Sequence, residues 1–360
     1  MVAGFGLTNM IHHCAKNFNF LARNKEKVMS ELINKLVANA SALNKTIVLT
    51  EGEDKRVVTA ASEIVRKKIA KIVLLGDEAQ IKADNPEVDL TGVEIINPKT
   101  SPKLKEYTNL LYELRKAKGM TMEQAEATAC ESTYFGTLML KAGDVDGLVS
   151  GACHSTANTL RPGLQIIKTA PGVPLVSSFF LMIAPEQGNQ YCKDGAFVFS
   201  DCGLEPNPDP DKLAFIAVSA ARSAKALAGL DPKVALLSFS SKGSAKHDDV
   251  AKVVAAVQKA HELAPELNID GELQFDAAIV PSVAKSKAPN STVAGQANVL
   301  IFPDLDAGNI GYKIAERLGG FMAVGPVCQG FAKPMNDLSR GCKAEDIVLT
   351  VALTALQTQI

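Results

Sequence analysis

Short runs of β-branched and aliphatic residues alternate along this chain with longer segments whose apolar residues recur at a helical spacing. In the first half this pattern predicts strands at 46–50, 71–76, 92–96 and 145–151, and helices at 54–68, 102–118 and 121–141. In the second half it predicts strands near 175–183, 196–200, 233–239 and 298–302, and helices near 210–229, 248–263 and 304–318. Regular alternation of strands and helices predicts an α/β fold with mostly parallel sheets.

The length of the chain points to more than one core. A chain of 360 residues exceeds the size at which single hydrophobic cores usually stop growing, so two α/β halves are expected. The Pro-Gly-Val-Pro segment at 171–174 is the best candidate for the hinge between them, because proline stiffens a crossing and glycine lets it turn.

Composition and charge exclude several classes of partner. The chain is 47% hydrophobic and 21% charged, with a formal net charge of −1, so nothing in its charge balance indicates a nucleic-acid partner. No apolar run approaches the roughly 18 residues of a membrane span. The seven cysteines contain no CxxC pair, so neither a zinc site nor a disulfide framework is indicated. A reducing cytoplasm is therefore the expected compartment.

Residues 1–28 differ from the remainder of the chain. They are basic and nearly free of acids, but they lack the layout of a secretory signal, since their apolar stretch precedes the basic residues. Two interpretations stay open. Residues 1–28 are either a loosely ordered N-terminal extension, or they precede a start at Met29.

The first candidate site follows the predicted strand at 145–151. Ligands of open α/β sheets gather at the carboxyl ends of strands, and here Ser155, Thr156 and Thr159 could donate hydrogen bonds to phosphate oxygens. A helix starting near Thr159 would point free N–H groups at an anion, with Arg161 in its first turn. The alternative is that Asn158 or Thr159 only caps the helix and Arg161 is solvated.

The second candidate site is the glycine-rich segment 325–348, where a polar stretch containing Ser339 and Arg340 precedes a predicted helix. Arginine suits phosphate because its planar fork donates two hydrogen bonds at once. Ser339 is better interpreted as a hydrogen-bond donor than as a nucleophile, because Asp337 stands where a GxSxG elbow needs glycine. His154 and His247 are interpreted as hydrogen-bonded bystanders, and nothing pairs Cys153 or Cys342 with a clear base for a covalent route.

Four segments in this order resemble the phosphate acetyltransferase (phosphotransacetylase) family, and the resemblance extends from about Ser30 to the end of the chain. The segments are 150–172, 237–247, 306–320 and 325–348. The resemblance implies two α/β domains with mostly parallel sheets, like those of isocitrate and isopropylmalate dehydrogenases, with the active site in a cleft between them, and a homodimer. It also implies a discontinuous first domain of 29–170 plus 326–360, a second domain of 171–325 inserted into it, and 1–28 as an N-terminal extension.

The resemblance also implies a reaction and roles for particular residues. The family transfers an acetyl group between phosphate and coenzyme A, which is a substrate rather than a cofactor, and no metal or other cofactor is expected. Matching positions assign catalysis to Ser339, Arg340, Asp346 and Arg161, binding of acetyl phosphate to Ser155, Thr156, Thr159, Arg161, Tyr312 and Arg340, and binding of coenzyme A to Arg115 and Arg317.

Asp346 is the residue that the family pattern proposes as base for the thiol of coenzyme A. Carboxylates and thiols differ by roughly four pKa units, and an Asp in the first turn of a helix is stabilised as an anion. Orienting the thiol could therefore matter more than taking its proton, and a purely structural role at the helix terminus is the alternative.

Three other functions are left open. A phosphate butyryltransferase would share the motifs and differ only in the size of its acyl pocket. A non-catalytic domain that senses acetyl-CoA would share the fold, although Ser339, Arg340 and Asp346 are all present. A nicotinamide-dependent dehydrogenase of the same architecture is less favoured, because the chain has no GxGxxG fingerprint.

Overall fold

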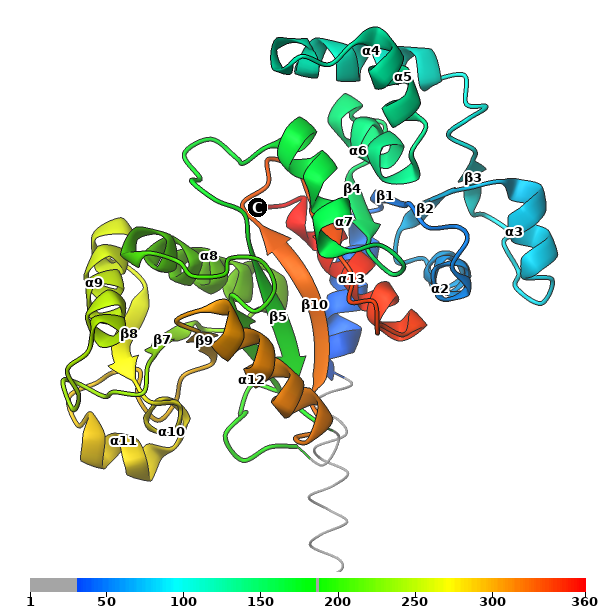
Figure 1. The fold of residues 1–360 in the computed structure, drawn as a ribbon. Helices are drawn as coiled ribbons and strands as arrows, with labels where there is room; N and C mark the ends of the chain where they lie inside the picture. Colours follow the sequence, from blue (N-terminus) through cyan, green and yellow to red (C-terminus); the bar gives the residue numbers. More distant parts are fainter. Residues whose placement is uncertain (1–30, 186–187) are drawn as a thin grey trace, which may run out of the picture.

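The computed structural model describes residues 31–185 and 188–360, so the interpretations of residues 1–28 lie outside the described residues. The chain forms two β-sheets that lie side by side with helices packed around them (Figure 1). The first sheet has five strands in the order β11-β4-β1-β2-β3, and all of its pairings are parallel. The second has six in the order β10-β5-β6-β9-β7-β8, with β5 antiparallel to both of its neighbours and the remaining pairings parallel. The prediction of an α/β fold with mostly parallel sheets is confirmed.

The first sheet and its helices come from both ends of the chain. A helix that includes residues 31–42 packs Leu32, Leu36 and Ala40 into the core. The elements that follow are β1 (Thr46–Leu49), α2 (Lys55–Arg66), β2 (Lys71–Leu75), α3 (Glu78–Asp84), β3 (Glu94–Ile96), α4 (Leu104–Arg115), the 3₁₀ helix η1 (Lys116–Lys118), α5 (Met122–Ala129), α6 (Ser132–Ala142), β4 (Gly147–Ser150), α7 (Thr156–Pro162), the π-helix η2 (Gly163–Ile167) and, at the C-terminus, β11 (Met335–Asp337) and α13 (Ala344–Gln357).

The second sheet and its helices occupy the middle of the chain. They are β5 (Ser177–Ile183), β6 (Ala196–Ser200), α8 (Pro210–Ala228), β7 (Lys233–Leu237), α9 (Asp248–Leu263), β8 (Asn268–Leu273), α10 (Phe275–Ile279), α11 (Pro281–Lys287), β9 (Val299–Ile301), α12 (Leu305–Arg317) and β10 (Met322–Gln329). The predicted boundary between residues 325 and 326 falls inside β10, and the division into domains stays a prediction.

Local signals explain where several helices begin and end. The side chain of Asp54 accepts the N–H of Arg56 at the start of α2, and Asp209 caps α8 just before a proline at its first position. Gly229 ends α8 with φ = 66°, a left-handed conformation that glycine adopts without a steric cost.

One predicted element was wrong, and several short elements were not predicted. The predicted helix at 121–141 is two helices, because α5 ends at Ala129 and the backbone of Glu131 is extended before α6 begins. The short elements α3, β8, α10, α11, β10 and β11 were not predicted, since most of them are too brief to show a periodic pattern.

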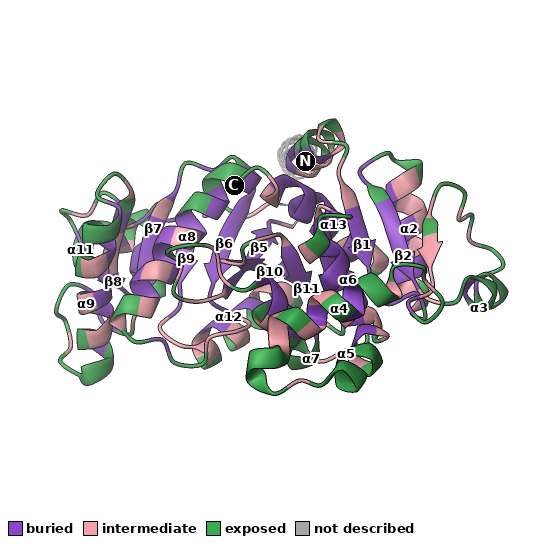
Figure 2. Cartoon of the chain, turned by 90° about the horizontal axis from the view of Figure 1, so that it is seen from above, coloured by how far each residue is buried: buried purple, intermediate pink, exposed green. Residues whose placement is uncertain are grey.

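The C-terminal helix α13 joins the two halves of the molecule. All ten residues from Ile347 to Leu356 are buried, and one apolar cluster includes residues of α13, of both sheets, and of α2 and α8. Figure 2 shows buried residues running from the second sheet through α13 to the first. Among the described residues, no helix is both long and apolar enough to cross a bilayer. The shared core therefore holds the facing edges of the two sheets in fixed positions.

Candidate active site

A cavity of about 350 Å³ lies where segments from the two sheets face each other. Its walls are formed by the loop after β4, the segment after β11, part of α12 and the residues that follow β6. Its lining residues, which define the active-site cavity below, are His154, Thr156, Phe180, Cys202, Gly203, Asn309, Tyr312, Lys313, Pro326, Asp337, Leu338, Ser339, Arg340 and Gly341. Of the predicted site residues, Thr156, Tyr312, Ser339 and Arg340 are thus brought together.

The helix after the β4 loop begins earlier than expected. It starts at Thr156 rather than near Thr159, and the cap is Ser155, whose hydroxyl accepts the N–H of Asn158 at 3.3 Å. Arg161 therefore lies in the last turn of α7, exposed to solvent, instead of the first turn. Neither Ser155 nor Thr159 lines the active-site cavity, and Thr159 is fully buried.

The loop that precedes α7 is folded around a buried carboxylate. Glu51, at the carboxyl end of β1, is 1% exposed and accepts the backbone N–H groups of Gly151, Ala152 and Cys153 at 2.8–3.0 Å. Its Oε1 also lies 2.7 Å from Nδ1 of His154. These amides are consequently not free to bind phosphate, and the loop offers side chains instead.

Arg56 connects the loop after β4 with the segment after β11 through hydrogen bonds. Its Nη2 donates to the carbonyl of Ala152 at 2.7 Å, and its Nη1 donates to the carbonyls of Arg340 and Cys342 at 2.8 and 2.9 Å. A hydrogen bond with Asp54 raises the pKa of the Arg56 guanidinium above its usual value, so the side chain stays cationic. The position of the Arg340 backbone therefore depends on Arg56.

Asp337 lies at the base of the active-site cavity. It is 1% exposed, and its Oδ2 accepts the hydroxyl of Thr156 at 2.7 Å. Burial raises its pKa to about 6, against the lowering effect of the hydroxyl of Thr156. A β-carbon on Gly151 would lie 2.1 Å from Oδ1 of Asp337, which explains why only glycine fits at the end of β4.

Tyr312 and Ser339 present hydroxyl groups to the cavity from opposite sheets. The ring of Tyr312 stacks on Phe180 with centroids 4.0 Å apart, and burial raises the pKa of its phenol to about 12. The phenol is therefore a hydrogen-bond donor at neutral pH. Ser339 is half-buried, and its hydroxyl accepts the N–H of Gly341 at 3.3 Å, which leaves its proton available to a ligand.

Asp346 is half-buried at the start of α13, outside the lining of the active-site cavity. Its Oδ2 accepts the N–H of Lys343 at 2.8 Å, a helix-capping contact. Burial raises its pKa, while the same N–H and the charges of Lys343 and Arg317 lower it. Arg317 therefore lies near Asp346 in space, although its own side chain is 68% exposed and it does not line the cavity.

Arg115 of α4 and Arg161 of α7 both lie near Tyr134. The charges of both lower the pKa of Tyr134, whose own burial raises it. The Nε of Arg115 is buried without a hydrogen-bond partner. Neither arginine lines the active-site cavity, so any contact with coenzyme A would be made outside it.

The thiols near the site are poor nucleophiles. Burial, together with the charges of Glu51 and Glu53, raises the pKa of Cys153 well above its usual range, and burial raises the pKa of Cys342 to about 11. Glu51, Cys153 and His154 form the one metal-like grouping within the described ranges, with ligand atoms inside 4.8 Å. Both oxygens of Glu51 already accept N–H groups, so we do not count these residues as metal ligands.

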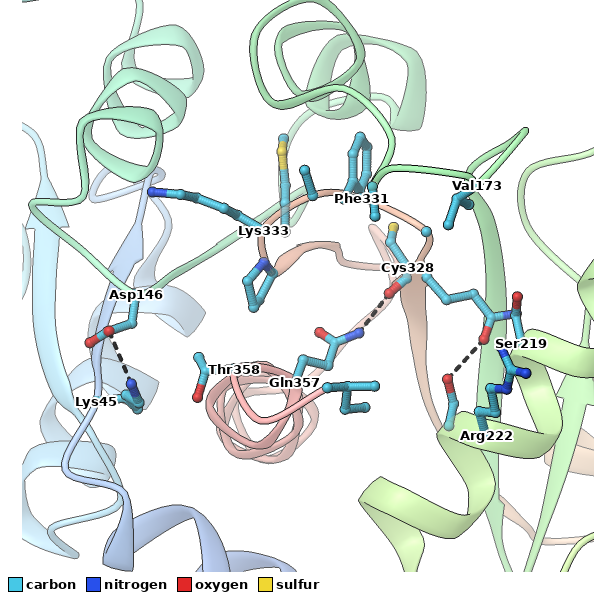
Figure 3. Close-up of a pocket in the computed structure, with 18 of the residues that line it drawn as sticks. Lys45, Asp146, Val173, Ser219, Arg222, Cys328, Phe331, Lys333, Gln357 and Thr358 are labelled. Atoms are coloured by element: carbon cyan, nitrogen blue, oxygen red, sulfur yellow. Dashed lines mark hydrogen bonds and ion pairs between the residues drawn. The ribbon is translucent and has the colours of Figure 1, made fainter.

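A second cavity, of about 560 Å³, lies between the two sheets at the opposite end of the strands (Figure 3). Lys45 and Asp146, which form an ion pair at 3.2 Å, precede β1 and β4, and Gln357 closes one side by donating to the carbonyl of Cys328 at 2.6 Å. None of the predicted site residues lines it. We call it the rear cavity. It lies at the amino ends of β1, β4 and β11 in the first sheet, which is unusual for a substrate site.

Three residues that shape the site were not predicted: Glu51, Arg56 and Asp337. The available signal was the polar Glu-Gly-Glu-Asp-Lys-Arg stretch directly after the first predicted strand, because ligand sites collect at the carboxyl ends of parallel strands. Arg56 lies within the helix predicted at 54–68, and nothing in that helical pattern indicates a role in the site. Asp337 had no comparable signal, since β11 is three residues long.

Comparisons with known proteins agree with this geometry. Residues 31–355 match the family described as phosphate acetyl/butaryl transferase. The phosphate acetyltransferase of Acetivibrio thermocellus is 57% identical over 327 residues, covering 91% of this chain and 98% of that protein.

Solved structures give the same result. The EutD phosphotransacetylase from Staphylococcus aureus is 49% identical, with a TM-score of 0.82 over 92% of this chain and 99% of that one. A phosphotransacetylase from Streptococcus pyogenes is 44% identical, with a TM-score of 0.84 over 92% and 98%. A 4-hydroxythreonine-4-phosphate dehydrogenase from Klebsiella pneumoniae, 10% identical with a TM-score of 0.50 over 88% of this chain and 100% of that one, shares only the fold. The chain belongs to the phosphate acetyl/butyryl transferase family.

Proposed function

We propose that this protein is a phosphate acetyltransferase, which interconverts acetyl phosphate and coenzyme A with acetyl-CoA and phosphate. The observation that carries the proposal is the active-site cavity, where the family-matched Ser339 and Arg340 meet Thr156 and Tyr312 from other elements. Relatives covered over nearly their whole length bear the name of this activity.

The proposed reaction is a direct attack of the coenzyme A thiolate on the acetyl carbon in a ternary complex. The C–S bond forms as the C–O bond to phosphate breaks, and phosphate leaves as a stable anion. Arg340 neutralises the developing charge, while the hydroxyls of Ser339 and Tyr312 donate to the phosphoryl oxygens. The raised thiol pKa values of Cys153 and Cys342 support a route without an acyl-enzyme.

The remaining matched residues are assigned to the surroundings of the cavity. Arg161 and Thr159 belong to α7, and Ser155 caps it. Of α7 only Thr156 lines the cavity, so a role of the other three in phosphate binding requires the cleft to close. Arg115 and Arg317 are proposed to meet the phosphates of coenzyme A, and Asp346 to orient its thiol. No metal is proposed, because arginines can carry the charge of the leaving group.

Acetyl transfer is favoured over butyryl transfer. Relatives that are 50–57% identical to this chain bear the name phosphate acetyltransferase. Each buried methylene is worth about 0.8 kcal/mol, so a pocket suited to butyrate would favour butyryl phosphate by about tenfold or more. A purely sensing domain is disfavoured because Ser339, Arg340 and Asp346 are all present.

We further propose a cytoplasmic homodimer. The six cysteines of the described residues are all free, in keeping with a reducing compartment. A contiguous apolar cleft on α10 and α12, which includes Phe239, Phe275, Ile314 and Leu318, suits a second copy of the chain.

The first test is thioester formation from acetyl phosphate and coenzyme A, followed by absorbance with a metal chelator present. Rapid release of phosphate with one thioester per phosphate is expected. Butyryl phosphate, run in parallel, should turn over more slowly. Folded protein that binds acetyl-CoA but turns over neither acyl phosphate would overturn the proposed function.

A further inference from the structure

A histidine at the wall of the active-site cavity has a buried carboxylate behind it. Nδ1 of His154 lies 2.7 Å from Oε1 of Glu51, a side chain that is 1% exposed. Because both oxygens of Glu51 already accept backbone N–H groups, the carboxylate is the acceptor here too, and Nδ1 carries the proton. The other ring nitrogen, Nε2, then has a free lone pair.

His154 lines the active-site cavity, where the substrates are proposed to bind. Nε2 is on the opposite side of the ring from the buried Glu51, and the His154 side chain, 36% exposed, lines the same cavity as Ser339 and Arg340. No hydrogen bond of Nε2 is found within the described ranges. A base held in one tautomer by a buried carboxylate, with its second nitrogen open to a reacting group, is the arrangement that activates weak nucleophiles.

We propose that Nε2 of His154 accepts the thiol proton of coenzyme A, with Glu51 as the residue that positions the ring. The inference rests on the proposed acyl transfer. In the forward direction the S–H proton passes to Nε2, the sulfur electron pair forms the C–S bond, and the C–O electron pair leaves with phosphate. In the reverse direction the protonated ring returns that proton to the departing thiolate, so proton and charge balance in both directions.

The two carboxylates nearby are less suited to this step. Asp346 lies outside the cavity lining, and its Oδ2 is occupied by the N–H of Lys343. Asp337 lines the cavity but is 1% exposed, and its Oδ2 accepts the hydroxyl of Thr156. Imidazoles as a class also titrate closer to thiols than carboxylates do, which favours efficient proton transfer at neutral pH.

The pH dependence of such a base is set by the charges around it. Glu51 lies behind the ring, and Cys153 lies beside it with Glu53 in contact with that thiol. Across the cavity are Asp337 and Arg340 from the C-terminal segment and Lys313 from α12. Arg56 holds the carbonyl of Ala152 in the same loop.

The test compares His154→Ala and His154→Gln with the parent enzyme. A lost general base predicts a fall of about 100-fold or more in kcat/KM for coenzyme A at neutral pH. The loss of activity toward low pH, which is the acid limb of the pH–rate profile, should disappear in both variants. Calorimetry should show that they still bind coenzyme A. Added imidazole should restore part of the activity of His154→Ala. Glu51→Gln should keep the acid limb but lower kcat. His247→Asn, which retains a side chain able to cap α9, is the matched control and should behave as the parent.

The outcomes separate this inference from the proposed function. If the parent enzyme forms acetyl-CoA, the proposed function stands whatever the variants do. A His154→Gln enzyme within roughly threefold of the parent, a loss of turnover that leaves the acid limb in place, or a failure of imidazole to rescue His154→Ala would each overturn the role of His154. An acid limb that disappears in Asp337→Asn or Asp346→Asn instead would do the same.

Discussion

Arg340 is a predicted catalytic residue whose backbone is fixed by one neighbour, Arg56, while its side chain remains exposed to solvent. Its carbonyl is held by Arg56, while its exposed guanidinium lines the active-site cavity. Arg340→Ala should lower kcat by about tenfold to a hundredfold, because charge-assisted hydrogen bonds contribute about 1.5–3 kcal/mol each. Steady-state kinetics with both substrates would measure this. Arg222→Ala, in the rear cavity, is the control, and near-normal turnover of Arg340→Ala would exclude the assigned role.

Arg56 should matter to turnover without touching either substrate. Arg56→Lys keeps the charge but cannot donate to Ala152, Arg340 and Cys342 at once, so the two site loops should separate. We expect kcat to fall about tenfold, since misplacement by about 1 Å is costly in a preorganised site, while the protein remains folded. Arg66→Lys, in the exposed last turn of the same helix, is the control. Equal kinetics for the two variants would contradict this explanation.

Asp337 makes stability depend on pH in a direction opposite to most carboxylates. Burial raises its folded pKa to about 6, so the folded state holds a proton that the unfolded state releases between about pH 4 and pH 6. Its contribution is therefore favourable at low pH and lost as pH rises through 6. Asp337→Asn should remove this dependence and be more stable than the parent above pH 6, by at most about 3 kcal/mol. Urea unfolding at a series of pH values measures it, and parallel curves for the two proteins would contradict the prediction.

At the scale of elements, Asn336 on β11 joins three segments that are distant in sequence. Its Oδ1 accepts the N–H of Cys328 on β10 at 2.7 Å, and its Nδ2 donates to Thr354 and Gln357 on α13 at 2.8 and 2.7 Å. Asn336 is fully buried, so Asn336→Ala should leave several buried polar groups without a hydrogen-bond partner. We expect the free energy of unfolding to fall by about 2–4 kcal/mol. Chemical denaturation measures the change, with exposed Gln359→Ala as control. If Asn336→Ala lowered the free energy of unfolding no more than the control does, water would have replaced the hydrogen bonds of the Asn336 side chain.

The long elements could be predicted from sequence, and the short ones that build the site could not. Strands such as β1 and helices such as α8 carry clear periodicity and strong caps, and they were found near their observed bounds. β11 has three residues and no pattern of its own, yet it places Asp337 in the cavity. The early start of α7 was missed because Ser155, Asn158 and Thr159 are all plausible caps, and only the tertiary contact of Thr156 with Asp337 distinguishes them.

Of the site residues recognised from motifs, four line the active-site cavity and the others lie outside it. The four are Thr156, Tyr312, Ser339 and Arg340. Residues that act on the loops rather than on a ligand, such as Glu51 and Arg56, carry no local signature. Their partners lie about a hundred residues or more away in sequence and become visible only when the sheets are assembled.

At the scale of the whole molecule, the site needs both sheets and the helix that joins them. Asp337 to Gly341 come from the end of β11 in the first sheet and the segment after it, whereas Phe180, Asn309 and Tyr312 come from the second sheet and its helix α12. The buried helix α13 begins directly after this segment and packs against both sheets. The helix that carries Arg161, α7, reaches the active-site cavity only through its first residue, Thr156.

The last prediction concerns how many copies of the chain assemble. The apolar cleft has a volume of about 780 Å³, and around it Leu318, Ile314 and Phe239 are 85%, 53% and 58% exposed. A monomer that left these side chains in water would forgo the free energy of burying them, which is about 1.5–3 kcal/mol for each large apolar side chain. Leu318→Glu combined with Ile314→Glu should therefore convert a dimer into monomers.

Light scattering after size exclusion would measure the change in mass. Leu263→Glu, a 48% exposed position at the end of α9 that does not line the cleft, is the matched control and should remain dimeric. The active-site cavity and the apolar cleft share no lining residue, so the monomeric variant should retain acyl transfer at high protein concentration. A double variant that stays dimeric would show that the interface lies elsewhere. A parent protein that is monomeric at every concentration would show that there is no such interface.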